Sequence, residues 1–289
     1  MDLGEEASLT EGAEHGKRQN MSIQVIFFFF LFWGSATHAI EIGPTDYYLP
    51  EGYLRDIITR QAHPASGHAE ALKRAFKATI FLPQRGTAAL VSAQGLVVTA
   101  AHVIAHKVIG ETKDCGKIVF HLNHQLDQDG GLERPILLPC EEVLVYNYNA
   151  DFALLRVRSP AELPQLPYVP MAKDGESFEG RFVLIAGHPH AMDYAKSFKV
   201  ISEGRIFFNG SEDPDLPHFL HLVDTEGGHS GAPVFTVSGE LLGVHFRGVP
   251  DYGTGVTGSV DGVRQTLHRF NVAIFLPYFV KKYAEWFGP

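Results

Sequence analysis

Three residues of reactive type lie beside short apolar runs in this sequence. His102 follows the run Gly95–Val98, and the small residues around it leave room for its imidazole. A histidine in such a place can act as a general base near neutral pH. Asp151 precedes the apolar run Phe152–Val157. A buried acid there can orient a histidine tautomer and stabilise the imidazolium.

The third residue, Ser230, lies in a glycine-rich turn before a short apolar run. Gly227, Gly228 and Gly231 permit positive φ and a close approach of the backbone to a ligand. The backbone amides of Gly228 and Ser230 can then point at a developing oxyanion. The nucleophile elbow of α/β-hydrolases is excluded, because it needs glycine two residues after the serine and Ala232 stands there.

The elements that must position these residues are predicted to be strands. Short β-rich runs recur at close spacing with Gly, Pro, Asn and Asp between them, which is typical of a sandwich or barrel. A Pro-, Ser- and Gly-rich stretch, 159–179, divides the runs into two sets. Residues 277–287 have near-helical apolar spacing, so we expect a C-terminal amphipathic helix. The expected runs are 78–82, 87–91, 96–99, 118–122, 142–146, 152–157, 182–185, 197–202, 204–208, 219–223, 233–237 and 241–245.

The composition excludes several classes of protein. The chain has 289 residues, of which 45% are hydrophobic and 20% charged, and this balance is that of a soluble globular protein. A net charge of −9 argues against binding nucleic acid through bulk charge. Two cysteines cannot form a disulfide scaffold or a four-cysteine zinc site.

The N-terminus has the features of an export signal. Val25–Trp33 is wholly apolar, and as a helix it spans only about 14 Å, too short for a bilayer core. Thr37 and Ala39 fit the −3 and −1 positions of a signal-peptidase site. We therefore expect residues 1–39 to be an upstream segment with a signal peptide, and no stable membrane insertion after cleavage. Residues 40–75 lack strand-like alternation and are interpreted as a propeptide or an N-terminal arm.

Export also bears on the two cysteines. Cys115 and Cys140 are able to pair in an oxidising compartment, and we expect a disulfide between them. Two unpaired buried thiols are the alternative.

The order His102, Asp151, Ser230 on an all-β background is that of chymotrypsin-type enzymes. With the motifs around these residues, the chain from about 76 to 289 resembles a trypsin-like serine peptidase of the bacterial secreted kind. The resemblance implies two six-stranded antiparallel β-barrels, about 76–170 and 171–289, with a C-terminal helix and the site in the cleft between the barrels.

The resemblance also implies a mechanism. Ser230 attacks a peptide carbonyl, His102 takes its proton, and Asp151 orients the imidazole. The amides of Gly228 and Ser230 stabilise the oxyanion, and water then hydrolyses the acyl-enzyme. No metal or organic cofactor is needed, and the partners are protein or peptide substrates in a secreted or periplasmic location.

One departure concerns the residue before the serine. Animal trypsins carry an Asp there that pairs with a newly freed N-terminus, whereas this chain has His229. The activation switch is therefore expected to be absent. Of two interpretations, a solvated side chain is favoured over a perturbed oxyanion turn.

The residues expected to form the S1 pocket leave the P1 preference open. Thr225 and His245, in the stretch Gly243–Gly248, resemble the residues with which glutamyl endopeptidases bind an acidic P1 side chain, and His N–H and Thr O–H groups are suitable donors for a carboxylate. Phe246 lines the same strand, and Arg247 adds positive charge. Asp224 argues for Lys or Arg at P1, because it stands where a trypsin has its pocket acid.

Two other functions compete with that of an active endopeptidase. An HtrA-type quality-control protease with a peptide-binding module is disfavoured, because the last strands and the helix take up the residues after Ser230. A pseudoprotease that binds a partner is the alternative from another class, and a plugged cleft would indicate it.

Overall fold

The computed structural model describes residues 47–60, 62–104, 115–161, 163–173, 178–209, 217–260 and 263–287. The predicted signal peptide, residues 1–39, lies outside the described residues. Across the described ranges, no helix is both long and apolar enough to span a bilayer.

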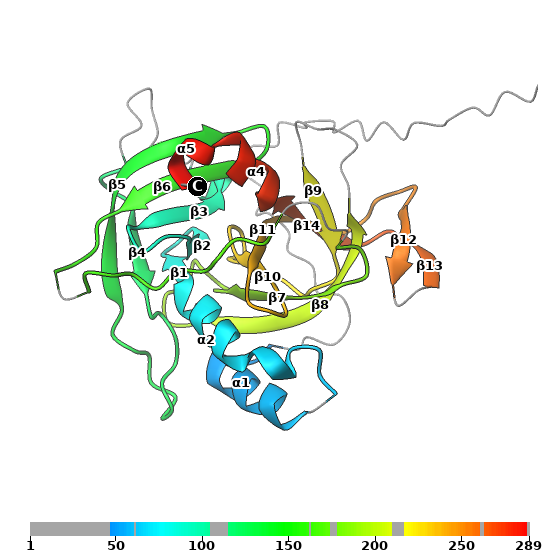
Figure 1. Cartoon of the computed structure of the whole chain (residues 1–289), viewed down its shortest axis with the longest axis horizontal. Helices are drawn as coiled ribbons and strands as arrows, with labels where there is room; N and C mark the ends of the chain where they lie inside the picture. The colour runs from blue at the N-terminus through cyan, green and yellow to red at the C-terminus, as the bar shows by residue number, and fades with distance from the viewer. Residues whose placement is uncertain are drawn as a thin grey trace, which may run out of the picture. The chain divides into compact units, whose positions relative to one another are not determined.

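Twelve strands close into two six-stranded antiparallel barrels (Figure 1), as predicted. The strand order is β1-β2-β3-β6-β5-β4 in the first barrel and β10-β11-β14-β9-β8-β7 in the second. The first barrel contains β1 (Thr79–Leu82), β2 (Gly86–Leu90), β3 (Leu96–Ala100), β4 (Val119–Leu122), β5 (Ile136–Asn147) and β6 (Phe152–Val157). The second contains β7 (Phe182–Gly187), β8 (Val200–Asn209), β9 (His218–His221), β10 (Pro233–Thr236), β11 (Leu241–Val249) and β14 (Phe270–Phe275).

The apolar pattern explains which strands lie deepest. All five residues of β3 are buried, because one face fills the first barrel and the other packs against neighbours that include β11. In β5, by contrast, the buried Leu138 and Cys140 alternate with exposed positions, so one face of this strand meets solvent.

The strand predictions after residue 182 differ from the structure in three places. Residues 197–202 and 204–208 were expected to be separate runs, but Val200–Asn209 is one strand. Gly204 does not break it. A Cβ at this position would lie 2.8 Å from the carbonyl oxygen of Leu222, so glycine is needed for close approach of the two backbones.

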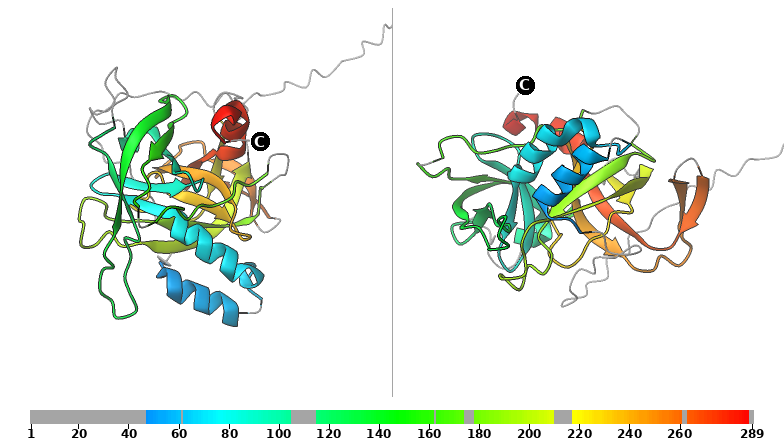
Figure 2. Two further views of the ribbon diagram at one scale, coloured as in Figure 1. Left: turned by 60° about the vertical axis from the view of Figure 1, so that its left-hand side comes forward. Right: turned by 90° about the horizontal axis from the view of Figure 1, so that it is seen from below.

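The second difference is β14 (Phe270–Phe275), a strand of the second barrel that the pattern did not predict. The third is a hairpin that the pattern also did not predict. Strands β12 (Val256–Val260) and β13 (Val263–Leu267) pair only with each other and extend away from the second barrel (Figure 2). Most described positions of β13 are exposed, so it lacks the buried face that makes a strand visible in a sequence.

The C-terminal helix is confirmed, although it is broken into α4 (Leu276–Lys282) and α5 (Ala284–Phe287). Phe279 of α4 is fully buried, and its ring stacks on Phe152 of β6 at a centroid distance of 4.5 Å. The helix thus covers the first barrel near the turn that carries Asp151.

The segment before the first barrel is helical. It contains α1 (Pro50–Thr59), the 3-10 turn η1 (Ser66–His68) and α2 (Ala69–Ala78). Pro50 suits the first helical turn because proline lacks the amide hydrogen that would be unsatisfied there. Both helices are amphipathic, and their buried residues include Tyr53, Ile57, Leu72 and Phe76.

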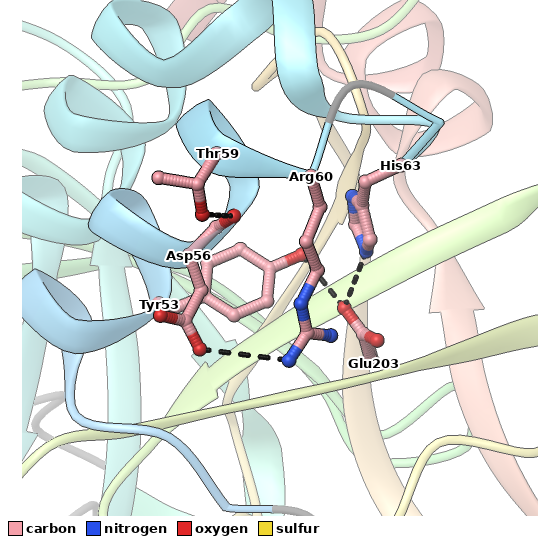
Figure 3. Close-up of polar contacts among 6 residues, drawn as sticks. All are labelled: Tyr53, Asp56, Thr59, Arg60, His63 and Glu203. Atoms are coloured by element: carbon pink, nitrogen blue, oxygen red, sulfur yellow. Dashed lines mark hydrogen bonds and ion pairs between the residues drawn. The ribbon is translucent and has the colours of Figure 1, made fainter.

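Polar contacts attach this helical segment to the second barrel. The hydroxyl of Tyr53 donates to Glu203 Oε2 at 2.8 Å, and His63 Nε2 lies 3.1 Å from the same oxygen (Figure 3). The buried Lys199 donates from Nζ to the carbonyl oxygen of Phe76 at 2.9 Å, in the last turn of α2. Burial lowers the pKa of Lys199 to about 7, so this amine is only partly protonated at neutral pH.

The predicted disulfide is confirmed. Cys115 and Cys140 are joined, and the residues that the structure describes contain no free cysteine. The bridge links the segment just before β4 to the middle of β5.

Candidate active site

The strand register brings His102 and Asp151 together. Strand β3 pairs with β6 so that Ala100 lies opposite Phe152. His102, in the short helix α3 (Ala101–Ile104), and Asp151, in the turn before β6, therefore meet at the same end of this pair.

Two short contacts join these two residues. His102 Nδ1 lies 2.6 Å from Asp151 Oδ2, and the backbone N–H of His102 donates to Asp151 Oδ1 at 2.8 Å. Asp151 adopts φ +52°, a left-handed conformation that aspartate and asparagine tolerate better than most residues. The carboxylate thus accepts the Nδ1 proton, which leaves His102 Nε2 as the basic nitrogen. In the described residues, Nε2 has no hydrogen-bond partner.

His102 and Ser230 line one cleft. Its volume is about 310 Å³, and the residues that line it are Gln84, Arg85, His102, Val103, Met192, Gly228 and Ser230. None of these comes from residues 47–78, so this helical segment does not plug the cleft. Ser230 lies in the turn before β10, so the two barrels contribute opposite walls.

The glycine turn around Ser230 has the positive φ angles that its sequence permits. Gly228 has φ +111° and Gly231 has φ +83°, conformations that L side chains rarely adopt. A Cβ on Gly228 would also lie within 3.0 Å of Ala191. The turn is fixed further because Gly231 N–H donates to the carbonyl oxygen of His245 at 2.7 Å.

The prediction of a solvated His229 is wrong. Its side chain is fully buried, and the ring stacks on Tyr47 at a centroid distance of 5.6 Å. Gly187 makes the space, because a Cβ there would run into the imidazole. Burial lowers the pKa of His229 to about 4, so the ring is neutral near pH 7. The backbone N–H of Glu226 donates to Nδ1 of the His229 ring, and the carbonyl oxygen of Glu226 lies near the same nitrogen.

The residues predicted to form the S1 pocket are gathered in the second barrel. Four of them, Asp224, Thr225, His245 and Phe246, are buried, and Arg247 is exposed. The hydroxyl of Thr225 donates to Asn271 Oδ1 at 3.0 Å. Asn271 Nδ2 in turn donates to the carbonyl oxygen of Val223 at 2.8 Å, which fixes the amide orientation. The only hydroxyl proton of Thr225 is therefore already used in a hydrogen bond within the protein.

A histidine pair determines the tautomer of His245. The backbone N–H of Val223 donates to His221 Nδ1 at 3.3 Å, so the proton of this ring is on Nε2. His221 Nε2 lies 3.2 Å from His245 Nδ1, which must accept, and His245 keeps its own proton on Nε2. Burial, with His221 nearby, lowers the pKa of His245 well below its usual value.

Sequence reasoning missed Asn271, His221 and Thr87, whose contacts reach the predicted site residues. Asn271 and His221 act through polar contacts between strands that are distant in sequence. No local motif marks such a residue, and the burial of His221 and Asn271 is visible only in the structure.

The fold and this site define the class of the protein. Two closed six-stranded barrels, with a paired His and Asp on one wall of the cleft and a serine turn on the other, are the chymotrypsin-like architecture. A family model described as "Trypsin-like peptidase domain" matches residues 86–244, more than half of the chain. The chain belongs to this family.

Several curated proteins named as serine proteases or endoproteases are similar to the chain. The chain is 26% identical over 273 residues to the mitochondrial serine protease HTRA2 of Bos taurus, covering 89% of this chain and 51% of that protein. It is 27% identical over 161 residues to a probable periplasmic serine endoprotease, DegP-like, of Ectopseudomonas mendocina, covering 55% and 28%. The chain thus spans about half the length, or less, of these curated relatives.

Two further likenesses are narrower. A glutamyl endopeptidase of Staphylococcus epidermidis is 27% identical over 114 residues, which is 38% of each chain. The crystal structure of a serine endoprotease from Yersinia pestis matches with a TM-score of 0.51 at 18% identity, over 75% of this chain and 65% of that one. The match to the HTRA2 relative covers far more of this chain than the glutamyl endopeptidase match, so the likeness to the latter family is partial.

Proposed function

We propose that this protein is a serine endopeptidase that uses His102, Asp151 and Ser230 to hydrolyse peptide bonds through an acyl-enzyme. The observation that carries the proposal is the 2.6 Å contact between His102 Nδ1 and Asp151 Oδ2 in a cleft that Ser230 also lines. Names of relatives such as HTRA2 and the DegP-like protein support the same reaction class. An open cleft argues against a pseudoprotease.

Each step of the proposed hydrolysis uses a particular group of the site. His102 Nε2 takes the proton of Ser230 Oγ as the oxygen attacks the carbonyl carbon, and later gives that proton to the leaving amine. Asp151 keeps the imidazole in the right tautomer and stabilises its charged form. The amides of Gly228 and Ser230 stabilise the oxyanion. Water then attacks the acyl-enzyme with His102 as the base, which returns Ser230 to its starting state.

For the substrate, we propose an acidic P1 residue. The tautomer chain from Val223 through His221 leaves His245 with an Nε2–H donor, which suits a carboxylate. Because Thr225 gives its proton to Asn271, His245 carries this recognition with less help than the glutamyl endopeptidase resemblance implies. The buried Asp224 supports the competing preference for Lys or Arg.

We also propose that the protein is exported and that residues 47–75 are an N-terminal arm of the mature enzyme, not a removable propeptide. The disulfide Cys115–Cys140 fits an oxidising compartment, and one similar protein is named periplasmic. The arm interpretation rests on the buried side chains of α1 and α2 and on the stacking of Tyr47 on His229, beside the nucleophile.

The test is proteolysis of a mixed peptide library by the full exported chain, with the new termini read by mass spectrometry. Ser230→Ala is expected to abolish cleavage while leaving the unfolding transition unchanged, because it removes only the nucleophilic oxygen. Cuts after Glu or Asp would support His245 as the residue that binds the P1 side chain. Cuts after Lys or Arg would assign this role to Asp224 instead. Undiminished cleavage by Ser230→Ala would refute the reaction class, and no cleavage by the wild type would favour a binding function.

A further inference from the structure

Thr87, on β2 of the first barrel, makes polar contacts on both sides of the nucleophile turn in the second barrel. Its backbone N–H donates to the carbonyl oxygen of Ser230 at 2.8 Å. Its hydroxyl donates to the carbonyl oxygen of Gly228 at 2.9 Å and accepts the backbone N–H of His188 at 3.1 Å. Its own carbonyl oxygen accepts the hydroxyl of Thr99 at 2.8 Å. No part of Thr87 is exposed.

These contacts enclose the stretch that supplies the oxyanion donors. The carbonyl groups of Gly228 and Ser230 are both held by Thr87, and the amides proposed to meet the oxyanion belong to the same two residues. Gly228, at φ +111°, has no side chain to limit its backbone rotation. The hydrogen bond from the Thr87 hydroxyl to the Gly228 carbonyl oxygen restrains this part of the backbone instead.

The neighbouring loop depends on the same hydroxyl. The N–H of His188 reaches it, and His190 N–H donates to the carbonyl oxygen of Gly227 at 2.7 Å. The Thr87 hydroxyl therefore joins three segments: β2, the loop after β7 and the nucleophile turn. A valine of the same shape would leave a buried carbonyl and a buried N–H without this partner.

We propose that Thr87 is a positioning residue for catalysis, whose hydroxyl holds Gly228 so that its amide meets the oxyanion of the tetrahedral intermediate. The inference rests on the proposed function and deepens it. Because the oxyanion forms only after attack, the hydroxyl acts on the transition state more than on substrate binding. Its loss should lower kcat and leave KM nearly unchanged.

The experiment uses the full chain and the library peptide that the wild type cuts fastest. Thr87→Val keeps the shape and removes the hydroxyl, and we expect kcat to fall about 10- to 100-fold, less than when an oxyanion donor is deleted outright. Thr87→Ser keeps the hydroxyl and should restore most of the activity. Thr79→Val is the matched control, because Thr79 is a buried strand threonine whose hydroxyl faces the carbonyl oxygen of Ala75 instead.

A second readout separates positioning from stability. A peptide aldehyde of the same sequence adds Ser230 Oγ to its carbonyl and places the resulting oxygen at the oxyanion amides. Its affinity should weaken in Thr87→Val by about the same factor as kcat/KM. If Thr87→Val does not fold, the comparison of Thr87→Ala with Thr87→Ser isolates the hydroxyl instead.

The outcomes are distinct. Wild-type kcat in Thr87→Val, an unchanged aldehyde affinity, or failure of Thr87→Ser to restore activity would each overturn the positioning role. If Ser230→Ala is inactive while Thr87→Val is fully active, this inference fails and the proposed function stands. If Ser230→Ala remains active, the proposed function itself fails.

Discussion

At the scale of single residues, the site depends on backbone conformations that few residue types adopt. Asp151 is one, because its φ of +52° turns the carboxylate back to meet both the ring and the backbone amide of His102. His229 is another case in which the surroundings decide the role. As a buried neutral ring stacked on Tyr47, it supports the turn by packing, where trypsins use an ion pair.

The first residue-scale prediction concerns Asp151. Asparagine also tolerates the left-handed conformation, so Asp151→Asn should fold normally. Its amide would donate to His102 Nδ1 and force the proton of the ring onto Nε2, where no proton can then be accepted from Ser230. We expect kcat to fall by about 10⁴-fold at neutral pH.

Library-peptide hydrolysis at pH 7.5 measures this effect, with the unfolding midpoint as the check on folding. A loss of less than tenfold in a folded variant would show that Asp151 does not set the tautomer of His102.

At the scale of elements, the helical segment before the first barrel is held by polar contacts as well as by apolar packing. The hydroxyl of Tyr53 and His63 Nε2 converge on one oxygen of Glu203 in β8. Burial and the Glu203 carboxylate raise the pKa of Tyr53 above its ordinary value, so the phenol keeps the proton that it donates. In addition, Tyr48 forms an antiparallel bridge with Ile201 of the same strand.

The corresponding prediction is that Glu203→Ala loosens the helical segment. Two partly buried donors lose their acceptor, and we expect the free energy of unfolding to fall by about 1–3 kcal/mol. Chemical denaturation followed by fluorescence measures it. Glu141→Ala is the matched control, because Glu141 pairs with Arg158 in an exposed ion pair 2.9 Å long whose loss should cost about 0–1 kcal/mol. Equal losses in the two variants would contradict the role of Glu203.

At the scale of the whole molecule, an unusual number of histidines are buried and neutral. Burial lowers the pKa of His124 and His229 to about 4 and that of His221 to about 3. It also lowers the pKa of His188 and His245 well below the usual value. These groups lie in or between the two barrels, so their protonation opposes the packed state of both.

The prediction is an acid-sensitive fold. In the unfolded chain these histidines bind protons near pH 6.5, whereas in the folded chain they do not, so the unfolded state binds more protons as the pH falls. Their contribution to stability is complete above about pH 6.5 and is lost as the pH falls towards the folded values. Each group contributes a slope of about 1.4 kcal/mol per pH unit in that window.

Denaturant unfolding between pH 7.5 and pH 5 checks the slope, a range chosen above the main titration of carboxylates. The variant His229→Asn should reduce this slope by the contribution of about one proton. A free energy of unfolding that stays constant across this range would rule out neutral buried histidines.

The sequence alone was enough for the all-β class, the six strands of the first barrel and the C-terminal helix, because local alternation and turn residues mark these elements. The disulfide followed from the two cysteines and the predicted export. In the second barrel the pattern divided β8 into two runs and did not mark β14. The sequence also supplied His102, Asp151 and Ser230 as candidates through their short motifs. Only the tertiary structure showed that His229 is buried and that His221 pairs with His245. The structure alone also showed the hydrogen bond from Thr225 to Asn271 and the contacts of Thr87 across the barrels. These depend on which distant strands become neighbours, and burial and hydrogen bonding at such contacts leave no periodic trace in the sequence.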